Sequence, residues 1–228
     1  TLNSIKSYTG SIPYEVIIIN DGSTDPETLI LLKELEKESY TILHQENKGP
    51  AAARNTGVKS SSGEYILFLD SDNRIRGTYI ERGVEILKRH QDVGIVYGNL
   101  SLFGERVNPA VLVPDFDMHR LLAGNYIDMC AMIRKKVWEE ICGFDENRRV
   151  MGFEDWDFWI MAGKIGWKFY HVNEVLFDYR VRPDSLLKQA RHPERYQEML
   201  NYVHSKHLDL FVEKYKNLYE QYNYYKHD

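Results

Sequence analysis

Short apolar runs alternate with amphipathic segments through the first hundred residues of the chain. The run 14–19 is β-branched and almost wholly apolar, which is typical of a strand buried on both faces. Pro26 then precedes Leu29, Leu32 and Leu35, which recur at helical spacing. The same alternation predicts strands at 40–45, 64–69 and 93–97, and helices at 50–59 and 78–90. This order favours an α/β fold with a mostly parallel sheet flanked by helices.

The pattern is less regular beyond residue 100. A loop-rich stretch contains Gly104, Pro109 and Pro114, and such stretches often carry binding residues. Beyond it we expect helices at 117–123, 136–141 and from 154 to about 165, and strands at 130–133, 168–172 and 175–180. An apolar and aromatic stripe at steps of three or four then predicts one long terminal helix: Leu208, Phe211, Tyr215, Leu218, Tyr222 and Tyr225. We therefore expect one domain over residues 1–185 and a C-terminal helical extension over 186–228.

Composition and charge narrow the class of protein. The 228 residues are 43% hydrophobic, which suffices for a sizeable core. A formal net charge of −5 argues against nucleic acid as the main partner. Cys130 and Cys142 are too few for a disulfide scaffold, so we expect two small core residues and a cytoplasmic location. No apolar run approaches the roughly 20 residues of a membrane helix, which leaves peripheral association with the inner membrane face as the open alternative.

Two aspartates directly follow the third predicted strand. Asp70 and Asp72 should lie at the carboxyl edge of the sheet, where open α/β sheets bind ligands. In extended backbone, residues two apart point to the same side. Both carboxylates could therefore face one Mg²⁺ or Mn²⁺ ion, which keeps open positions for phosphate. Such a pair is also common in solvated turns, and an Asp-x-Asp phosphotransferase with Asp70 as nucleophile is a further alternative.

A polar loop at 20–25 follows the first predicted strand. Its ordinary interpretation is a turn and a helix cap. As a nucleotide pocket, Gly22 would let the ligand approach the backbone, and Asp21 would accept a hydrogen bond from the base or ribose, with Asn20 and Ser23 beside them. A further loop places Lys48 and Gly49 before an Ala-rich helix whose N-terminus would favour an anion. Lys48 and Arg54 could equally be surface charges.

Three segments resemble, in order, successive blocks of the family 2 glycosyltransferases, inverting enzymes of GT-A (Rossmann-like) fold: residues 16–25, 47–57 and 64–72. The resemblance covers roughly residues 1–185 and lacks the family's first β-strand, so the chain is expected to begin inside its fold. It implies that Asp21 holds the nucleotide base, that Asp70 and Asp72 contact ribose and metal-diphosphate, and that Asp72 is the direct metal ligand. By the same resemblance, the default donor is a UDP-sugar, and the acceptor is a growing polysaccharide, a lipid-linked sugar or a protein.

The helix predicted from residue 154 begins with acidic and aromatic residues. This segment resembles the family's Glu-Asp motif, which makes Asp155 the candidate catalytic base and Glu154 its less certain companion. General-base assistance contributes on the order of 10²–10⁴ in rate. Acidic residues also stabilise helix N-termini, and Asp157 is expected on a solvated face. Trp156 and Trp159 are tentative acceptor contacts, although aromatics at this spacing are more often core residues.

The segment 179–185 resembles the end of the family's catalytic domain, where many members have a histidine after a Tyr-Arg pair. Arg182 stands at that position. Arginine cannot ligate a metal but binds phosphate, so Arg182 is a candidate diphosphate contact. The departure leaves a catalytically inactive nucleotide-binding or scaffold protein as an alternative.

Two features of the last segment have ordinary interpretations. His204 and His207 lack a third ligand and are expected on the helix surface. The tyrosine stripe is expected to pack on the domain or on a second copy of the chain.

Overall fold

The structure is a computed structural model with eight described strands surrounded by helices. It describes residues 1–38, 40–183, 188 and 190–226, without the side chains of 221 and 223–226. The described strands are β1 (Ile17–Asp21), β2 (Thr41–Gln45), β3 (Tyr65–Leu67), β4 (Arg74–Ile75), β5 (Val93–Gly104), β6 (Asn108–Val111), β7 (Met132–Arg134) and β8 (Lys168–Val181). The described helices are α1 (Leu2–Lys6), α2 (Pro26–Lys37), α3 (Pro50–Ser60), α4 (Tyr79–Arg89), α5 (Met118–Ala123), α6 (Lys135–Ile141), the 3-10 turn η1 (Arg148–Val150), α7 (Glu154–Lys164), α9 (Pro193–Lys206) and α10 (Leu208–Lys226).

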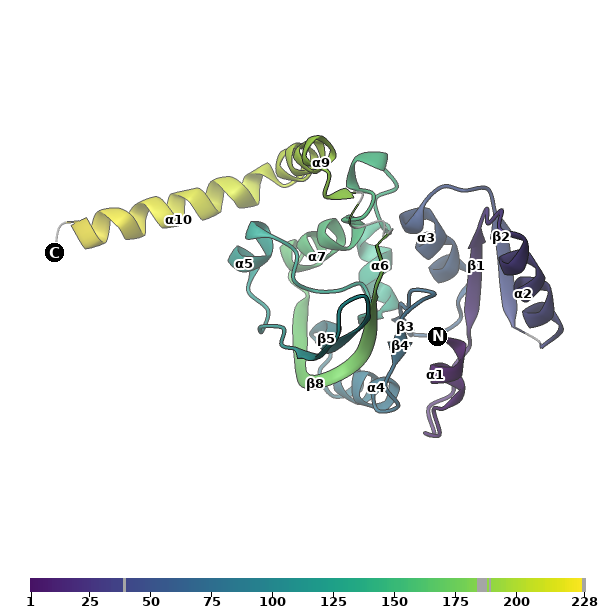
Figure 1. Ribbon diagram of the computed structural model, residues 1–228. Coiled ribbons are helices and arrows are strands. Elements are labelled where there is room, and N and C mark those ends of the chain that lie inside the picture. Colours follow the sequence, from purple (N-terminus) through teal and green to yellow (C-terminus); the bar gives the residue numbers. More distant parts are fainter. Residues whose placement is uncertain (39, 184–187, 189, 227–228) are drawn as a thin grey trace.

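The strands form two sheets (Figure 1). β1 and β2 are a parallel pair, and the second sheet has the order β3-β7-β5-β8-β4, with β6 paired to β5. The predicted α/β class is confirmed, but the second sheet is mixed: only β5 and β8 run parallel in it, and its other pairs are antiparallel. The sheet is mixed because β7, which follows a loop-rich connection, inserts between β3 and β5 and runs antiparallel to both.

Alternate residues of the central strands face two separate cores. Ile95 and Ile133 pack on the side that holds α6 and α7, whereas Val96 and Met132 pack on the side that holds α4. Helices therefore cover both faces of the six-stranded sheet, as the apolar runs predicted. Strands predicted at 168–172 and 175–180 are one strand, β8, whose pairing with β5 shifts register near Gly98.

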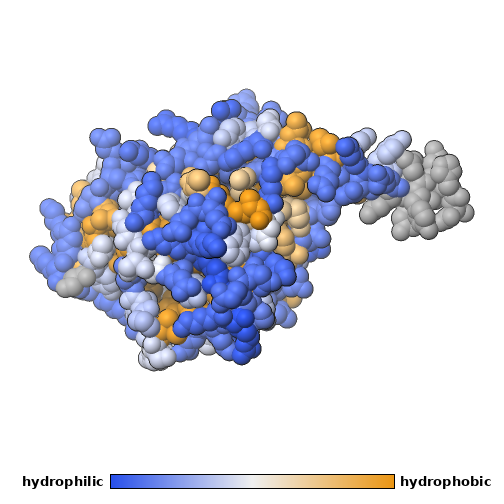
Figure 2. Space-filling view, turned by 180° about the vertical axis from the view of Figure 1, so that it is seen from behind, coloured by the Kyte–Doolittle hydropathy of each residue, from blue (hydrophilic) through white to orange (hydrophobic). Residues whose placement is uncertain are grey.

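The C-terminal segment departs in part from prediction. The long helix predicted from the stripe at Leu208 is confirmed as α10, but a separate helix, α9, precedes it and ends at His207. α9 buries Met199 and Val203 in the core that holds α7, so it is continuous with the domain. α10 projects away from the body (Figure 1), and apolar surface gathers near its base (Figure 2). No helix in the described part of the chain is both long enough and apolar enough to cross a membrane.

Cysteine placement also corrects the sequence prediction. Cys130 is buried, but Cys142 is exposed. Cys142 ends α6 with a left-handed backbone, φ +66°, and this position turns its side chain away from the core. Only Cys130 is a core residue.

Candidate functional site

Arg54 joins three segments that are distant in sequence. Its guanidinium donates to Asp70 Oδ1 at 2.9 Å and to Glu154 Oε1 at 2.5 Å. α3 therefore holds the loop after β3 against the start of α7. The two carboxylates raise the pKa of Arg54, although its burial acts in the opposite direction. The sequence left Arg54 open as a surface charge, and the structure buries most of its side chain.

Asp155 lies beside this ion-paired group. Burial raises the pKa of its carboxyl to about 8, and the neighbouring carboxylates of Glu154 and Asp128 add to the rise. Asn125 Nδ2 donates to Asp155 Oδ2 at 2.9 Å, and the backbone N–H of Trp156 donates to Oδ1 at 2.8 Å. These bonds fix the orientation of a carboxyl group that can accept a proton near neutral pH.

Asp128 is a member of the acidic group that sequence reasoning missed. Burial raises the pKa of its carboxyl to about 7, and repulsion from Asp70 and Asp72 contributes. The pKa of Tyr179 is raised to about 12 by burial and by the surrounding carboxylates, Asp128 first among them. The available signal was one acidic residue inside the apolar run 126–133, because a lone carboxylate there requires a specific partner or role.

Asp21 ties the first two polar loops together. Its carboxylate accepts hydrogen bonds from the backbone N–H groups of Lys48 and Gly49, at 2.9 and 2.8 Å, and from Gln45 Nε2 at 2.7 Å. The β1–α2 and β2–α3 loops are therefore neighbours. The Asp21 carboxylate therefore holds the backbone of the β2–α3 loop in place.

The turn after β1 is built around two of the predicted residues. Asn20 is buried, and its Oδ1 accepts from the backbone N–H of Ser23 at 2.9 Å. Gly22 has φ +72°, and a Cβ there would lie 2.7 Å from the backbone nitrogen of Asn47. Glycine is required at this position because both the backbone angle and the neighbouring loop exclude a side chain.

Asp72 and Arg182 also lie together. Arg182 Nε is 3.2 Å from Asp72 Oδ2. The structure thus places the predicted diphosphate contact beside the predicted metal ligand. The remainder of that motif, Asp184 and Ser185, and the expected domain boundary at 185/186 lie outside the described residues.

The carboxylates of Asp70 and Asp72 provide hard oxygen donors of the kind that Mg²⁺ and Mn²⁺ prefer. Among the described residues, no group of three or more His, Cys, Asp or Glu side chains is arranged to hold a metal. One or two carboxylates are sufficient for Mg²⁺ when waters and substrate phosphates complete its shell. The pKa of Asp128 is raised first by burial and then by repulsion from Asp70 and Asp72, so a divalent cation would relieve charge repulsion at this place and the residues present fit it.

Trp156 and Trp159 belong to the core. They are 2% and 0% exposed, and their indole N–H groups donate to the backbone oxygens of Leu121 and Ile127. Neither indole ring is open to a sugar. Both tryptophans are therefore core residues, the commoner role of such side chains, and the acceptor contact expected of them was wrong.

Two further expectations about polar residues were wrong. Asp157 is 2% exposed rather than solvated, and it binds Lys206 Nζ at 2.7 Å and His207 Nε2 at 2.8 Å. His207 is fully buried rather than on the helix surface. The sequence could not show this, because the partners come from α7 and from the junction of α9 and α10.

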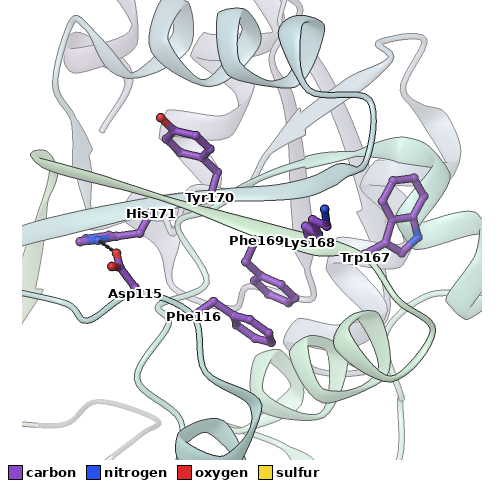
Figure 3. Close-up of a pocket in the computed structure, with 7 residues that line it drawn as sticks. All are labelled: Asp115, Phe116, Trp167, Lys168, Phe169, Tyr170 and His171. Atoms are coloured by element: carbon purple, nitrogen blue, oxygen red, sulfur yellow. Dashed lines mark hydrogen bonds and ion pairs between the residues drawn. The ribbon is translucent and has the colours of Figure 1, made fainter.

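A separate hollow of about 350 Å³ lies near the other end of α7 (Figure 3). It is lined by Asp115, Phe116 and residues 167–171. Phe116 stacks on Phe169 with ring centres 4.0 Å apart, and His171 Nδ1 is 2.9 Å from an Asp115 oxygen. A Cβ at Gly163, in the last turn of α7, would lie 3.1 Å from Phe116. Asp155 is in the first turn of α7, so the hollow and the acidic group lie at opposite ends of this helix. None of the residues that line the hollow belongs to the acidic group.

Comparison with known proteins gives a consistent result. The sequence model described as Glycosyl transferase family 2 matches residues 1–142, more than half of the chain. Glycosyltransferase GlyA of Streptococcus pneumoniae serotype 4 is 41% identical over 93 residues, which are 40% of this chain and 13% of that protein. An uncharacterised glycosyltransferase of Bacillus subtilis, YwdF, is 31% identical over 172 residues, or 72% of this chain and 62% of that protein. The chain thus spans less than two thirds of either relative.

Solved structures agree on the fold. S. aureus TarS 1-349 in complex with UDP-GlcNAc superposes with a TM-score of 0.69 at 20% identity, covering 89% of this chain and 60% of that one. Mannosyltransferase PcManGT of Pyrobaculum calidifontis superposes with a TM-score of 0.59 at 17% identity, covering 89% of this chain and 64% of that one. The GT-A fold and the family match together confirm the sequence resemblance. This chain belongs to glycosyl transferase family 2.

Proposed function

We propose that the chain transfers a sugar from a nucleotide-sugar donor to an acceptor hydroxyl with inversion at the anomeric carbon, in a metal-dependent reaction. One observation carries the proposal: Asp155, an oriented carboxyl group with a pKa raised to about 8, lies in the acidic group that Arg54 connects to the Asp70 loop. The solved neighbours that were crystallised with UDP-GlcNAc and with GDP-Man and Mn²⁺ support this donor class and the use of a metal.

Asp155 is the general base in this proposal. The acceptor oxygen attacks the anomeric carbon from the face opposite the diphosphate, and the new C–O bond forms as the bond to the diphosphate oxygen breaks. The acceptor proton passes to a carboxylate oxygen of Asp155. Asn125 holds that carboxylate in place, and Glu154 positions it through the ion pair with Arg54. A single displacement of this kind inverts the configuration.

Asp72 would ligate the divalent cation, with Asp70 as the second carboxylate. When bound, the cation supplies Lewis-acid stabilisation of the negative charge on the leaving nucleoside diphosphate. Arg182 lies 3.2 Å from Asp72, and its fork of donors suits the diphosphate oxygens at the same place. Arg54 holds the Asp70 carboxylate in position beside it.

The nucleotide is assigned to the joined loops after β1 and β2. Asn20, Gly22 and Ser23 shape the first loop, and Asp21 binds it to Lys48 and Gly49 of the second. UDP is the default nucleotide, and the acceptor is a growing surface polysaccharide, a lipid-linked glycan or a protein. We further propose a catalytic unit at 1–185, a cytoplasmic location that includes the inner membrane face, and self-association through the exposed stripe of α10.

Two measurements on the full chain test the proposal. Thermal stability is followed with nucleoside diphosphates and nucleotide sugars, with and without Mn²⁺; a ligand at 100 times its dissociation constant adds roughly 2.7 kcal/mol. We expect one nucleotide to stabilise the protein only with metal, and Asp72→Ala to abolish the effect while Glu34→Gln on α2 does not. Release of nucleoside diphosphate in the presence of acceptors then tests turnover. If no nucleotide raises the melting temperature, the non-catalytic alternative replaces the proposal.

A further inference from the structure

A cavity of about 710 Å³ lies beside the β2–α3 loop, on residues distinct from the acidic group. Three separate segments form it: the β2–α3 loop, the region of η1 and the first turns of α9. Its lining residues are Asn47, Lys48, Arg148, Arg149, Met151, His192, Glu194, Arg195 and Glu198. Neither Asp70, Asp72, Asp155 nor Arg182 contributes to its wall.

Positive charge predominates in this cavity. Four permanent cations line it, against two carboxylates, although the chain as a whole has a net charge of −5. Within the described part of the chain, none of the four forms an ion pair. Arg149 lies over the Tyr202 ring at 4.5 Å, and Arg195 donates to the backbone oxygen of Met151 at 3.4 Å. Neutral groups thus position Arg149 and Arg195, and the cavity keeps an excess of positive charge over its two carboxylates.

The start of α9 adds to the same potential. His192 is its N-cap residue and makes no side-chain capping bond, and Pro193 follows at the first helical position. The free N–H groups of this turn carry the partial positive charge of a helix N-terminus. Together with guanidinium groups, which bind phosphate oxygens in pairs, they form a site suited to a phosphate group.

The cavity lies close to the candidate base. A Cβ on Gly49 would meet the Met151 methyl group at 2.9 Å, so the wall of the cavity packs on the loop held by Asp21. The backbone N–H of Gly152 donates to Glu154 Oε2 at 2.6 Å. Met151 is four residues before Asp155, a span of at most about 14 Å. An extended molecule with an anionic group in the cavity can therefore reach the reaction centre.

We propose that this cavity binds a phosphate group of an anionic acceptor. The inference rests on the proposed transferase function and specifies its acceptor class. The donor diphosphate is already assigned to the separate group at Asp72 and Arg182, and of the cavity's cations only Lys48 also belongs to the proposed nucleotide loops, so an anion held by the three arginines requires a second anionic ligand. A neutral glycan would leave the excess of four cations over two carboxylates without a counter-charge.

Binding of inorganic phosphate to the full chain tests the site, followed by ³¹P NMR at constant ionic strength in metal-free buffer. Arg148→Gln and the double variant Arg148→Gln/Arg195→Gln remove guanidinium groups, and Arg89→Gln, at an exposed position on α4, is the matched control. We expect the dissociation constant to rise about tenfold or more for each lost guanidinium, and to stay unchanged in the control. Circular dichroism melts confirm that each variant is folded.

Competition with UDP distinguishes a phosphate group of the acceptor from the diphosphate of the donor. Addition of UDP with diamagnetic Mg²⁺ to the same sample should leave phosphate binding intact, whereas displacement by UDP would assign the cavity to the donor and overturn the proposal. If phosphate fails to bind, the cavity is not a phosphate site; if Arg89→Gln weakens binding as much as Arg148→Gln, the phosphate is an adventitious ion only. Either result overturns the proposal. Loss of the UDP–Mn²⁺ melting shift in the same wild-type sample would instead refute the transferase function. With an active acceptor, the double variant should raise KM for a phosphate-bearing acceptor and leave KM for the donor unchanged.

Discussion

Replacing Asp155 with Asn removes a carboxyl group whose surroundings disfavour its charged form. In the folded chain its pKa is raised from 3.8 to about 8, first by burial and then by Glu154 and Asp128. A carboxyl group with a raised pKa contributes stability that is fully present below its unfolded pKa and is lost as pH rises through its folded pKa. Wild-type protein should therefore lose this contribution between about pH 4 and pH 8, and the Asn variant should not.

The magnitude follows from the size of the shift. One pKa unit corresponds to about 1.4 kcal/mol, so the full shift would represent at most about 5–6 kcal/mol. Solvent at the half-buried carboxyl reduces this figure, and we expect roughly 2–4 kcal/mol. Asp155→Asn should thus gain roughly 2–4 kcal/mol of unfolding free energy relative to wild type when measured near pH 8 rather than near pH 4. The direct effect of exchanging carboxyl for amide on the unfolding free energy is the same at both pH values, so it cancels when the result at pH 4 is subtracted from the result at pH 8.

Urea denaturation in the presence of EDTA measures this difference. Glu34→Gln, at an exposed position on α2, is the control and should show the wild-type pH dependence. In turnover assays Asp155→Asn should lower kcat by about 10²–10⁴, because the proton acceptor is lost. A variant with the wild-type pH dependence of stability would refute the electrostatic argument, and one with wild-type kcat would remove Asp155 from the mechanism.

Three other substitutions test the scaffold. Trp159→Ala empties a fully buried site and should lower the unfolding free energy by about 3–5 kcal/mol in urea denaturation; a loss below about 1 kcal/mol would contradict the packing described. Asp157→Ala leaves Lys206 and His207 without their shared carboxylate and should cost about 3 kcal/mol by the same method, whereas a neutral result would show that the pair is solvated. Gly22→Ala, at φ +72°, should lower the melting temperature and weaken UDP binding in thermal shifts; unchanged binding would separate this turn from the nucleotide site.

Strands and helices followed from the sequence wherever one periodicity extended over a whole element. The helix at α3 and the strand at β2 were predicted almost to the residue. Sheet order was not predictable, because the position of β7 between β3 and β5 depends on pairing between residues about forty to seventy apart. The stripe from Leu208 onward predicted α10 correctly. The break at His207 was not predicted, because the contact of His207 with Asp157 joins residues fifty apart in sequence.

In the candidate site, too, features set by local sequence were predictable and features set by distant residues were not. The loops after β1 and β2 were predicted correctly to be neighbours, since the carboxyl ends of paired parallel strands meet at an edge. The expectation that Asp70 and Asp72 share one sheet edge with them missed that β3 belongs to the other sheet. Asp128 escaped notice because the raised pKa of its carboxyl depends on burial and then on repulsion from Asp70 and Asp72, which precede it by more than fifty residues. Trp156 and Trp159 were expected to contact the acceptor because they share a helix with Asp155. The helical spacing could not show that both side chains are buried.

Arg54 explains why the acidic group can exist in a folded chain. Clustered carboxylates repel one another, and the raised pKa values of Asp128 and Asp155 reflect that repulsion in addition to burial. The guanidinium of Arg54 binds Asp70 and Glu154 together, which offsets part of the repulsion and fixes both of those groups in place. Asp128 and Asp155 lie outside this ion pair, and the pKa values of their carboxyls stay raised. The same arginine thereby holds the loop after β3 against the start of α7 and leaves beside it two carboxyl groups whose charged forms a nearby cation would stabilise.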